Sequence, residues 1–282
     1  MSDLSLIKEL REKTGAGFLD CKNTLSENDN NIEQSIDSLR KKGLAKASKK
    51  SSREANEGAI GFYNNEKITV ILKINSETDF SAKSDTFLDF LDIIGNIALK
   101  TNDPNLNKDG FLKLDHNGKT ISDLVNEMIA KIGENLIIND LKVFDNKDKK
   151  VNYYVHNPYR KNIGKIVSAV FYSSEQENNE VKTFTKNLCM HIAASKPEAM
   201  DIDKLPNELI EGEKRIQEEM IKDSGKPSNV MEKILDGKMK KFYSEVTLLN
   251  QNCVMYTDKT VKEAINDFNT SNSLLLKNYV LI

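Results

Sequence analysis

A pattern of two strands followed by a helix occurs twice in this chain. Residues 59–76 indicate two strands around a turn, with Ile68, Val70, Leu72 and Ile74 alternating at period two. An apolar helical stretch follows at 86–100, and residues 151–174 with 182–196 repeat the arrangement. Apolar positions of the two copies match at one constant offset: Ile68, Leu72, Ile97 and Ala98 fall on Ile163, Val167, Ile192 and Ala193. The offset indicates a duplicated unit and therefore an α+β fold with antiparallel sheets.

The N-terminal segment has a different character. Residues 5–43 predict three short amphipathic helices, separated at Thr14-Gly15-Ala16-Gly17 and at 28–31 and closed by Gly43. Residues 45–58 are rich in Lys, Ala and Ser and predict a tether that is partly helical. The tether carries four basic side chains that could touch phosphate, Lys46, Lys49, Lys50 and Arg53. A solvated linker face is favoured, because the whole chain is not basic.

The later segments predict further helices. Residues 121–138 indicate an amphipathic helix that runs into a strand. Residues 207–242 predict a protruding helical hairpin, resembling an antiparallel coiled coil, with a turn at 224–227. Residues 245–256 predict a strand, and 259–268 predict the last helix.

These patterns predict four parts along the chain. We expect a three-helix N-terminal module at 1–44 and a linker at 45–57. We expect one core subdomain at 58–140 and a second at 141–282, the second carrying the hairpin 207–242.

Composition excludes several classes of protein. The 282 residues carry a net charge of −2, which argues against a dedicated nucleic-acid binder. No apolar run approaches the roughly 20 residues of a membrane span, and the N-terminus lacks an apolar signal core, so we expect a cytoplasmic protein without membrane contact.

Neither the cysteines nor the histidines form a recognisable ligand pattern. Cys21, Cys189 and Cys253 lie far apart without a CxxC motif, which favours small buried apolar residues in a reducing compartment. The three histidines have no paired spacing, so we expect neither a metal site nor a cofactor. Catalytic motifs such as GxSxG, GxxxxGK[ST], GxGxxG after a strand and HExxH do not occur, which favours binding over covalent catalysis.

The segment Thr78-Asp79-Phe80-Ser81 is the most unusual feature. It places a large apolar ring on a polar loop tip between a strand and a helix. One interpretation is that Phe80 fills the core at this corner, as most phenylalanines do. The other interpretation is that the ring is an exposed anchor for a partner.

Six motifs occur in the order and spacing of one protein family. They are TGAGFLDCKNTL (14–25), SETDFSAK (76–83), KIGEN (131–135), MHIAASKP (190–197), SGKP (224–227) and GKMKKFYSEVTLLNQNCVM (237–255). With these motifs, nearly the whole chain resembles bacterial elongation factor Ts. The resemblance implies a nucleotide exchange factor, without covalent chemistry, for the GTPase elongation factor Tu in its GDP-bound and nucleotide-free states.

The resemblance also implies which residues act. Asp79 and Phe80, flanked by Thr78 and Ser81, would enter the GTPase domain and disturb the Mg²⁺ site at the nucleotide phosphates. Family members usually carry valine at the position of Ser81. Further partner contacts would fall on residues outside this segment: Arg11, Phe18, Leu19, Ile132 and His156. His191 is expected to pack or to cap.

Two other classes of function remain alternatives. The three-helix module also resembles ubiquitin-associated domains, so an adaptor or scaffold is an alternative that would not need the Thr-Asp-Phe segment. An enzyme is a third possibility, although no cluster of residues supports it.

Many relatives continue into a C-terminal helix, whereas residues 274–282 predict a strand here.

Overall fold

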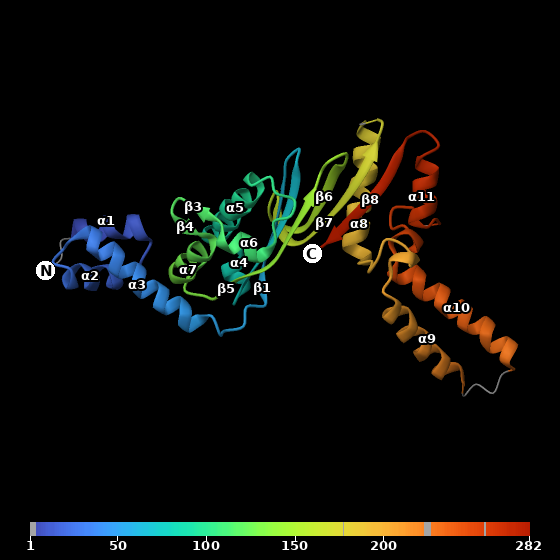
Figure 1. Ribbon diagram of the computed structural model, residues 1–282, viewed down its shortest axis with the longest axis horizontal. Helices are drawn as coiled ribbons and strands as arrows, with labels where there is room; N and C mark the ends of the chain where they lie inside the picture. The colour runs from blue at the N-terminus through green and yellow to red at the C-terminus, as the bar shows by residue number, and fades with distance from the viewer. Residues whose placement is uncertain (1–3, 177, 223–226, 257) are drawn as a thin grey trace. The chain divides into compact units, whose positions relative to one another are not determined.

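The computed structural model describes residues 4–176, 178–222, 227–256 and 258–282 (Figure 1). The chain divides into two compact units: Met1–Lys147 with Asn157–Lys165, and Asp148–His156 with Ile166–Ile282. The first unit contains α1 (Leu4–Thr14), α2 (Phe18–Glu27), α3 (Ile32–Lys50), β1 (Glu57–Asn64), β2 (Ile68–Ser76), α4 (Asp79–Lys83), α5 (Asp85–Lys100), α6 (Lys108–Lys113), β3 (Asp115–His116), β4 (Lys119–Thr120), α7 (Ile121–Ile132) and β5 (Leu136–Asp145). Strands β6 (Lys150–Arg160) and β7 (Ile163–Ser174) have residues in both units, and the second unit continues with α8 (Asn179–Ser195), η1 (Ile202–Lys204), α9 (Asn207–Lys222), α10 (Ser228–Val246), η2 (Leu248–Asn250), α11 (Val261–Phe268) and β8 (Leu274–Leu281).

An antiparallel sheet forms the centre of the first unit. Strand β2 pairs with β1 from Thr69↔Asn64 to Ser76↔Glu57, and with β5 on its other side from Ile68↔Asp145 to Ser76↔Leu136. Because β2 has neighbours on both sides and α5 packs against it, nearly all of its residues are buried. The predicted pair of strands around a turn is confirmed, with the turn beginning at Asn65 after β1, and so is the strand that follows the helix at 121–132.

The second copy of the repeat builds the core of the second unit. Strands β6 and β8 both flank β7, and β8 pairs with it from Ser168↔Leu281 to Ser174↔Leu274. Helix α8 buries Phe184, Leu188 and Ile192 in this core, where the Phe184 ring stacks on Phe268 at 4.2 Å between centroids. The predicted strand-strand-helix order, the last helix and the final strand are all confirmed.

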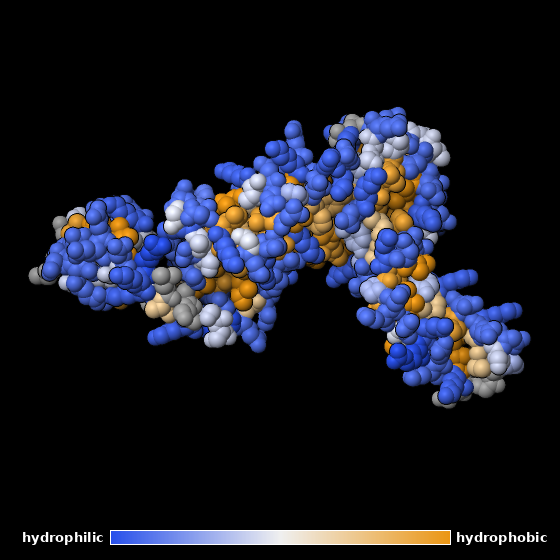
Figure 2. Space-filling view, viewed as in Figure 1, coloured by the Kyte–Doolittle hydropathy of each residue, from blue (hydrophilic) through white to orange (hydrophobic). Residues whose placement is uncertain are grey.

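Helices α9 and α10 form the predicted hairpin, which extends from the rest of the second unit (Figure 1). Its predicted turn lies outside the described residues except for Pro227, which precedes the first residue of α10. Figure 2 shows hydrophobic patches among the hydrophilic surface of the hairpin. Exposed apolar residues on its two arms are Leu209, Ile216, Met220 and Val230.

The three N-terminal helices are confirmed, but the prediction that Gly43 closes the third helix is wrong. Helix α3 continues to Lys50, so the start of the predicted linker is helical. The residues after Gly43 are mainly Ala and Lys, which favour helix over turn. A Cβ atom at Gly43 would lie 2.9 Å from the Cβ of Ala130 in α7, so the missing side chain allows close packing of α3 against α7.

The predicted strand at 245–256 is also wrong. This segment contains the end of α10, the short helix η2 and two isolated bridges, Ala199↔Thr247 and Asn252↔Thr260. Its backbone amides bond to loops instead of a strand ladder: the N–H of Leu248 donates to Ala199 O at 2.9 Å, and that of Cys253 to Lys259 O at 2.8 Å. Tertiary contacts thus override the β-rich composition of the segment.

All three cysteines are buried and free, as predicted for small apolar residues. His191 is buried in the second unit, which confirms the expectation that it packs. Its Nε2–H donates to Gln251 Oε1 at 3.0 Å, and its Nδ1 accepts from the N–H of Val254 at 3.3 Å. Both ring nitrogens are satisfied only in the neutral form, because a proton on Nδ1 would face an N–H donor.

We expect His191 to make the stability of this unit depend on pH. Burial lowers the pKa of His191, so below about pH 6.5 the unfolded chain binds a proton that the folded chain resists. The free energy of unfolding should therefore fall as the pH drops below that value. In His191→Gln, whose amide offers an NH2 donor group and a carbonyl acceptor but does not titrate, this part of the pH dependence should disappear. Urea unfolding of both proteins at several pH values measures it, and identical pH slopes would contradict the assignment.

Candidate functional site

Phe80 lies on the surface of the first unit. Its side chain is 84% exposed, more than that of any other large hydrophobic residue in the described part of the chain. The interpretation that this ring fills the core is therefore wrong for the free protein. Leaving a phenylalanine in water forgoes about 1.5–3 kcal/mol of burial free energy, which remains available for a partner surface.

The segment that carries Phe80 is a short helix and not the loop tip that the sequence suggested. Thr78 caps α4: its Oγ1 accepts a hydrogen bond from the N–H of Ser81 at 3.2 Å. The Glu134 carboxylate accepts two more bonds from Thr78, at 3.0 Å from the backbone N–H and at 2.8 Å from the hydroxyl. The helical turn therefore has a defined start despite its length of five residues.

Asp79 lies beside Phe80 and is paired within the same helix. Lys83 Nζ donates to Asp79 Oδ2 at 2.7 Å, and this bond holds the pKa of the Asp79 carboxyl below its ordinary value. The same bond raises the pKa of Lys83, whose ammonium lies 6.0 Å from the centroid of the Tyr159 ring. The exposed face of α4 thus presents an apolar ring next to a charged pair.

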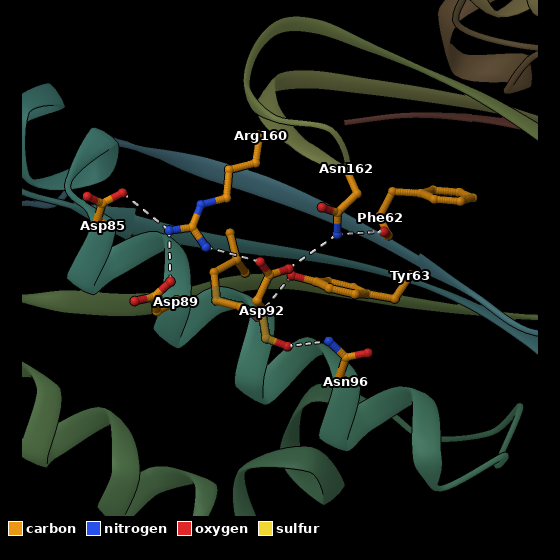
Figure 3. A network of polar contacts seen from close by, with 9 residues as sticks. Phe62, Tyr63, Asp85, Asp89, Asp92, Asn96, Arg160 and Asn162 are labelled. Atoms are coloured by element: carbon orange, nitrogen blue, oxygen red, sulfur yellow. Dashed lines mark hydrogen bonds and ion pairs between the residues drawn. The ribbon is translucent and has the colours of Figure 1, made fainter.

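Helix α5, which follows α4, is held by a polar network that Figure 3 shows. The Arg160 guanidinium contacts three carboxylates along one face of α5, with Nη2 at 2.8 Å from Asp89 Oδ1 and 3.4 Å from Asp85 Oδ1, and Nη1 at 3.3 Å from Asp92 Oδ2. The hydrogen bond to Asp89 makes the largest contribution to the raised pKa of Arg160. The buried Tyr63 hydroxyl adds a bond to Leu91 O at 2.9 Å. The network holds α5, the helix that follows α4 and Phe80 in the chain.

No group of three or more His, Cys, Asp or Glu residues that could hold a metal ion occurs among the described residues. No helix in the described ranges is both long enough and apolar enough to cross a bilayer.

Comparison with known proteins places the chain in a family. The profile of the family described as Elongation factor TS matches residues 77–280. The chain belongs to the elongation factor Ts family. It is 39% identical over 263 residues to the factors of Allorhizobium ampelinum and Rhizobium meliloti, covering 93% of this chain and 85% of each relative. It is 37% identical over 272 residues to the factor of Rickettsia felis, covering 95% and 87%.

Membership of the elongation factor Ts family confirms the resemblance drawn from the six motifs. It supports a role in translation elongation as a nucleotide exchange factor for elongation factor Tu. The matched region begins at Glu77 and so includes the whole of α4.

Ser81 occupies the position at which the elongation factor Ts resemblance implies valine. Its side chain is buried, and its Oγ has no hydrogen-bond partner among the described residues. An unsatisfied buried hydroxyl costs about 1–3 kcal/mol. Ser81 therefore faces the interior of its own unit, whereas Phe80 faces solvent.

The other elongation factor Ts candidates lie on separate parts of the chain. Arg11 is exposed on α1, and Phe18 and Leu19 are exposed at the start of α2. Ile132 ends α7 and packs partly against the core of the first unit. His156 belongs to the second unit, where it is exposed and its Nδ1 lies 3.2 Å from the Tyr154 hydroxyl.

Glu134 is the main residue that sequence reasoning missed. The motif KIGEN was recognised, but only Ile132 was chosen from it. Gly133 adopts φ +87, which ends α7 and turns the chain so that Glu134 reaches Thr78. The available signal was a carboxylate directly after a helix-ending glycine in KIGEN, a motif that belongs to the same family resemblance as SETDFSAK.

Proposed function

We propose that this chain binds elongation factor Tu and accelerates GDP release by inserting Asp79 and Phe80 next to its Mg²⁺ and phosphate site. The observation that carries the proposal is the exposure of Phe80 on a capped helical turn. Such a ring has nothing to fill in its own chain and is suited to wedge into another protein.

The free energies limit what one ring can do. An exchange factor must bind the partner more tightly as the nucleotide loosens, because equal binding to both states shifts nothing. Accelerating GDP release by about 10³- to 10⁴-fold requires about 4–5.5 kcal/mol of differential interaction. Burial of Phe80 supplies about 1.5–3 kcal/mol, so it acts as the wedge and other contacts supply the rest.

The remaining interaction would come from a broad interface and from the disturbed Mg²⁺ coordination. We assign Arg11, Phe18, Leu19, Ile132 and His156 to that interface. Arg11, Phe18, Leu19 and His156 expose their side chains in the free protein, and Ile132 is partly exposed, so a partner can reach all five. Thr78 and Ser81 flank the wedge and shape its backbone.

Asp79 would act as a hydrogen-bond acceptor more than as a repelling charge. Lys83 already neutralises much of the local charge of its carboxylate at 2.7 Å. A paired carboxylate still has free lone pairs and can occupy donors that hold the nucleotide phosphates.

The direct test is GDP release from elongation factor Tu loaded with fluorescent GDP, followed by stopped flow with and without this chain. We expect the rate of GDP release to rise with the concentration of this chain until it saturates. A release rate that does not change with added chain would refute the proposed function.

A further inference from the structure

Two segments of the first unit are tied to each other by a reciprocal pair of carboxylates. Glu134 accepts from the backbone N–H of Thr78 at 3.0 Å, and Glu77 accepts from the backbone N–H of Asn135 at 2.6 Å. Each segment thus supplies one carboxylate and one amide to the other. Hydrogen bonds to a charged acceptor are about twice as strong as neutral ones, so the pair is a firm connection.

The sheet brings the two segments together. Ser76, the last residue of β2, pairs with Leu136, the first residue of β5. Residues 77–78 and 134–135 therefore leave the sheet side by side. Asn135 extends the connection, because its Nδ2 donates to Arg53 O at 2.7 Å.

The bond from the Thr78 hydroxyl to Glu134 also fixes the cap of α4. A threonine hydroxyl has one hydrogen to donate and two lone pairs that accept. Glu134 Oε1 takes the hydrogen at 2.8 Å, so a lone pair of Oγ1 is directed to the Ser81 N–H at 3.2 Å. Without Glu134 the hydroxyl could rotate and the cap would lose its preferred orientation.

Helix α4 is held by contacts outside itself, which are the burial of Ser81 and Ala82 and the bonds at Thr78. It has five residues, far below the length at which an isolated helix is stable in water. Phe80 is 84% exposed, so packing of its own ring does not locate it. The position of the ring is therefore set by the backbone of α4 and by the groups that hold its first turn.

We propose that Glu134 is a positioning residue for Phe80: by binding both the amide and the hydroxyl of Thr78, it holds α4 so that the ring enters the partner in a productive geometry. This inference rests on the proposed function. Small misplacements of a group that must act at a defined place cost large factors in rate.

The test compares Glu134→Ala with Glu66→Ala in the full-length chain. Glu66 is an exposed carboxylate in the turn before β2, at the opposite end of that strand from Thr78. We expect Glu134→Ala to lower the maximal GDP-release rate about tenfold, with a smaller change in the half-saturating concentration. Glu134→Gln, which keeps one acceptor, should fall between, and Glu66→Ala should match the original chain. A maximal rate for Glu134→Ala within about twofold of the original would overturn the inference.

A double substitution shows whether Glu134 acts through Phe80. In the Phe80→Ala background, Glu134→Ala should lower the rate by less than about twofold, because the wedge is already gone. The same tenfold loss in both backgrounds would refute positioning and leave only a general structural role.

Amide hydrogen exchange of the free chain provides a measurement without the partner. Glu134→Ala should speed exchange in residues 78–83 and leave β1 and β2 unchanged. Unchanged exchange in α4 would overturn the inference even if the original chain accelerates GDP release. If the original chain fails in that assay, the proposed function falls, while the amide measurement still decides whether Glu134 orders α4.

Discussion

Replacing Phe80 by alanine should slow stimulated GDP release from elongation factor Tu by about tenfold or more, with a smaller loss of binding. The lost burial of about 1.5–3 kcal/mol corresponds to about one to two powers of ten in rate. Stopped-flow release of fluorescent GDP at saturating concentrations of the variant measures the rate. Titration with nucleotide-free partner measures the binding.

The same variant should fold as the original chain does. Because 84% of the ring is exposed, we expect its removal to change the free energy of unfolding by less than about 0.5 kcal/mol. Leu19→Ala is the comparison for a residue of the broad interface. It also shortens a highly exposed apolar side chain, but in the three-helix N-terminal module. An undiminished release rate in Phe80→Ala would refute the wedge.

Replacing Phe87 by alanine should destabilise the fold, unlike the replacement of Phe80. Phe87 lies on α5 in the core of the first unit and is fully buried. Deleting a buried phenylalanine side chain costs about 3–5 kcal/mol, because it removes burial and leaves a cavity. Urea unfolding followed by circular dichroism, together with amide exchange in β1 and β2, measures the loss in this unit.

Phe80→Ala is the matched control for Phe87→Ala. The two substitutions remove the same atoms, one from α4 and the other from the next helix, α5. If both destabilised the fold equally, the assignment of one ring to solvent and the other to the core would be wrong.

Much of the fold follows from the order of residues. Period-two alternation at 68–74 and helical spacing at 86–100 predicted β2 and α5, because each periodicity places apolar side chains on one face. The constant offset between the copies likewise predicted β6, β7 and α8. The two errors have different causes. At Gly43 the Ala- and Lys-rich residues that follow favour helix, and the missing side chain lets α3 pack closely against Ala130. At 245–256 the backbone bonds to Ala199 and Lys259 outweigh the local preference for strand.

Within the site, the sequence by itself determined the motif, the family resemblance and the residues Thr78 to Ser81. It could not decide whether Phe80 fills the core, since the same local pattern fits both outcomes. The tertiary structure decided that the ring is exposed, that Ser81 is buried and that Glu134 holds Thr78. The physical reason is that periodicity reports the face of one element, whereas exposure and capping depend on which distant segment lies beside it. Here the pairing of Ser76 with Leu136 brings that segment into place.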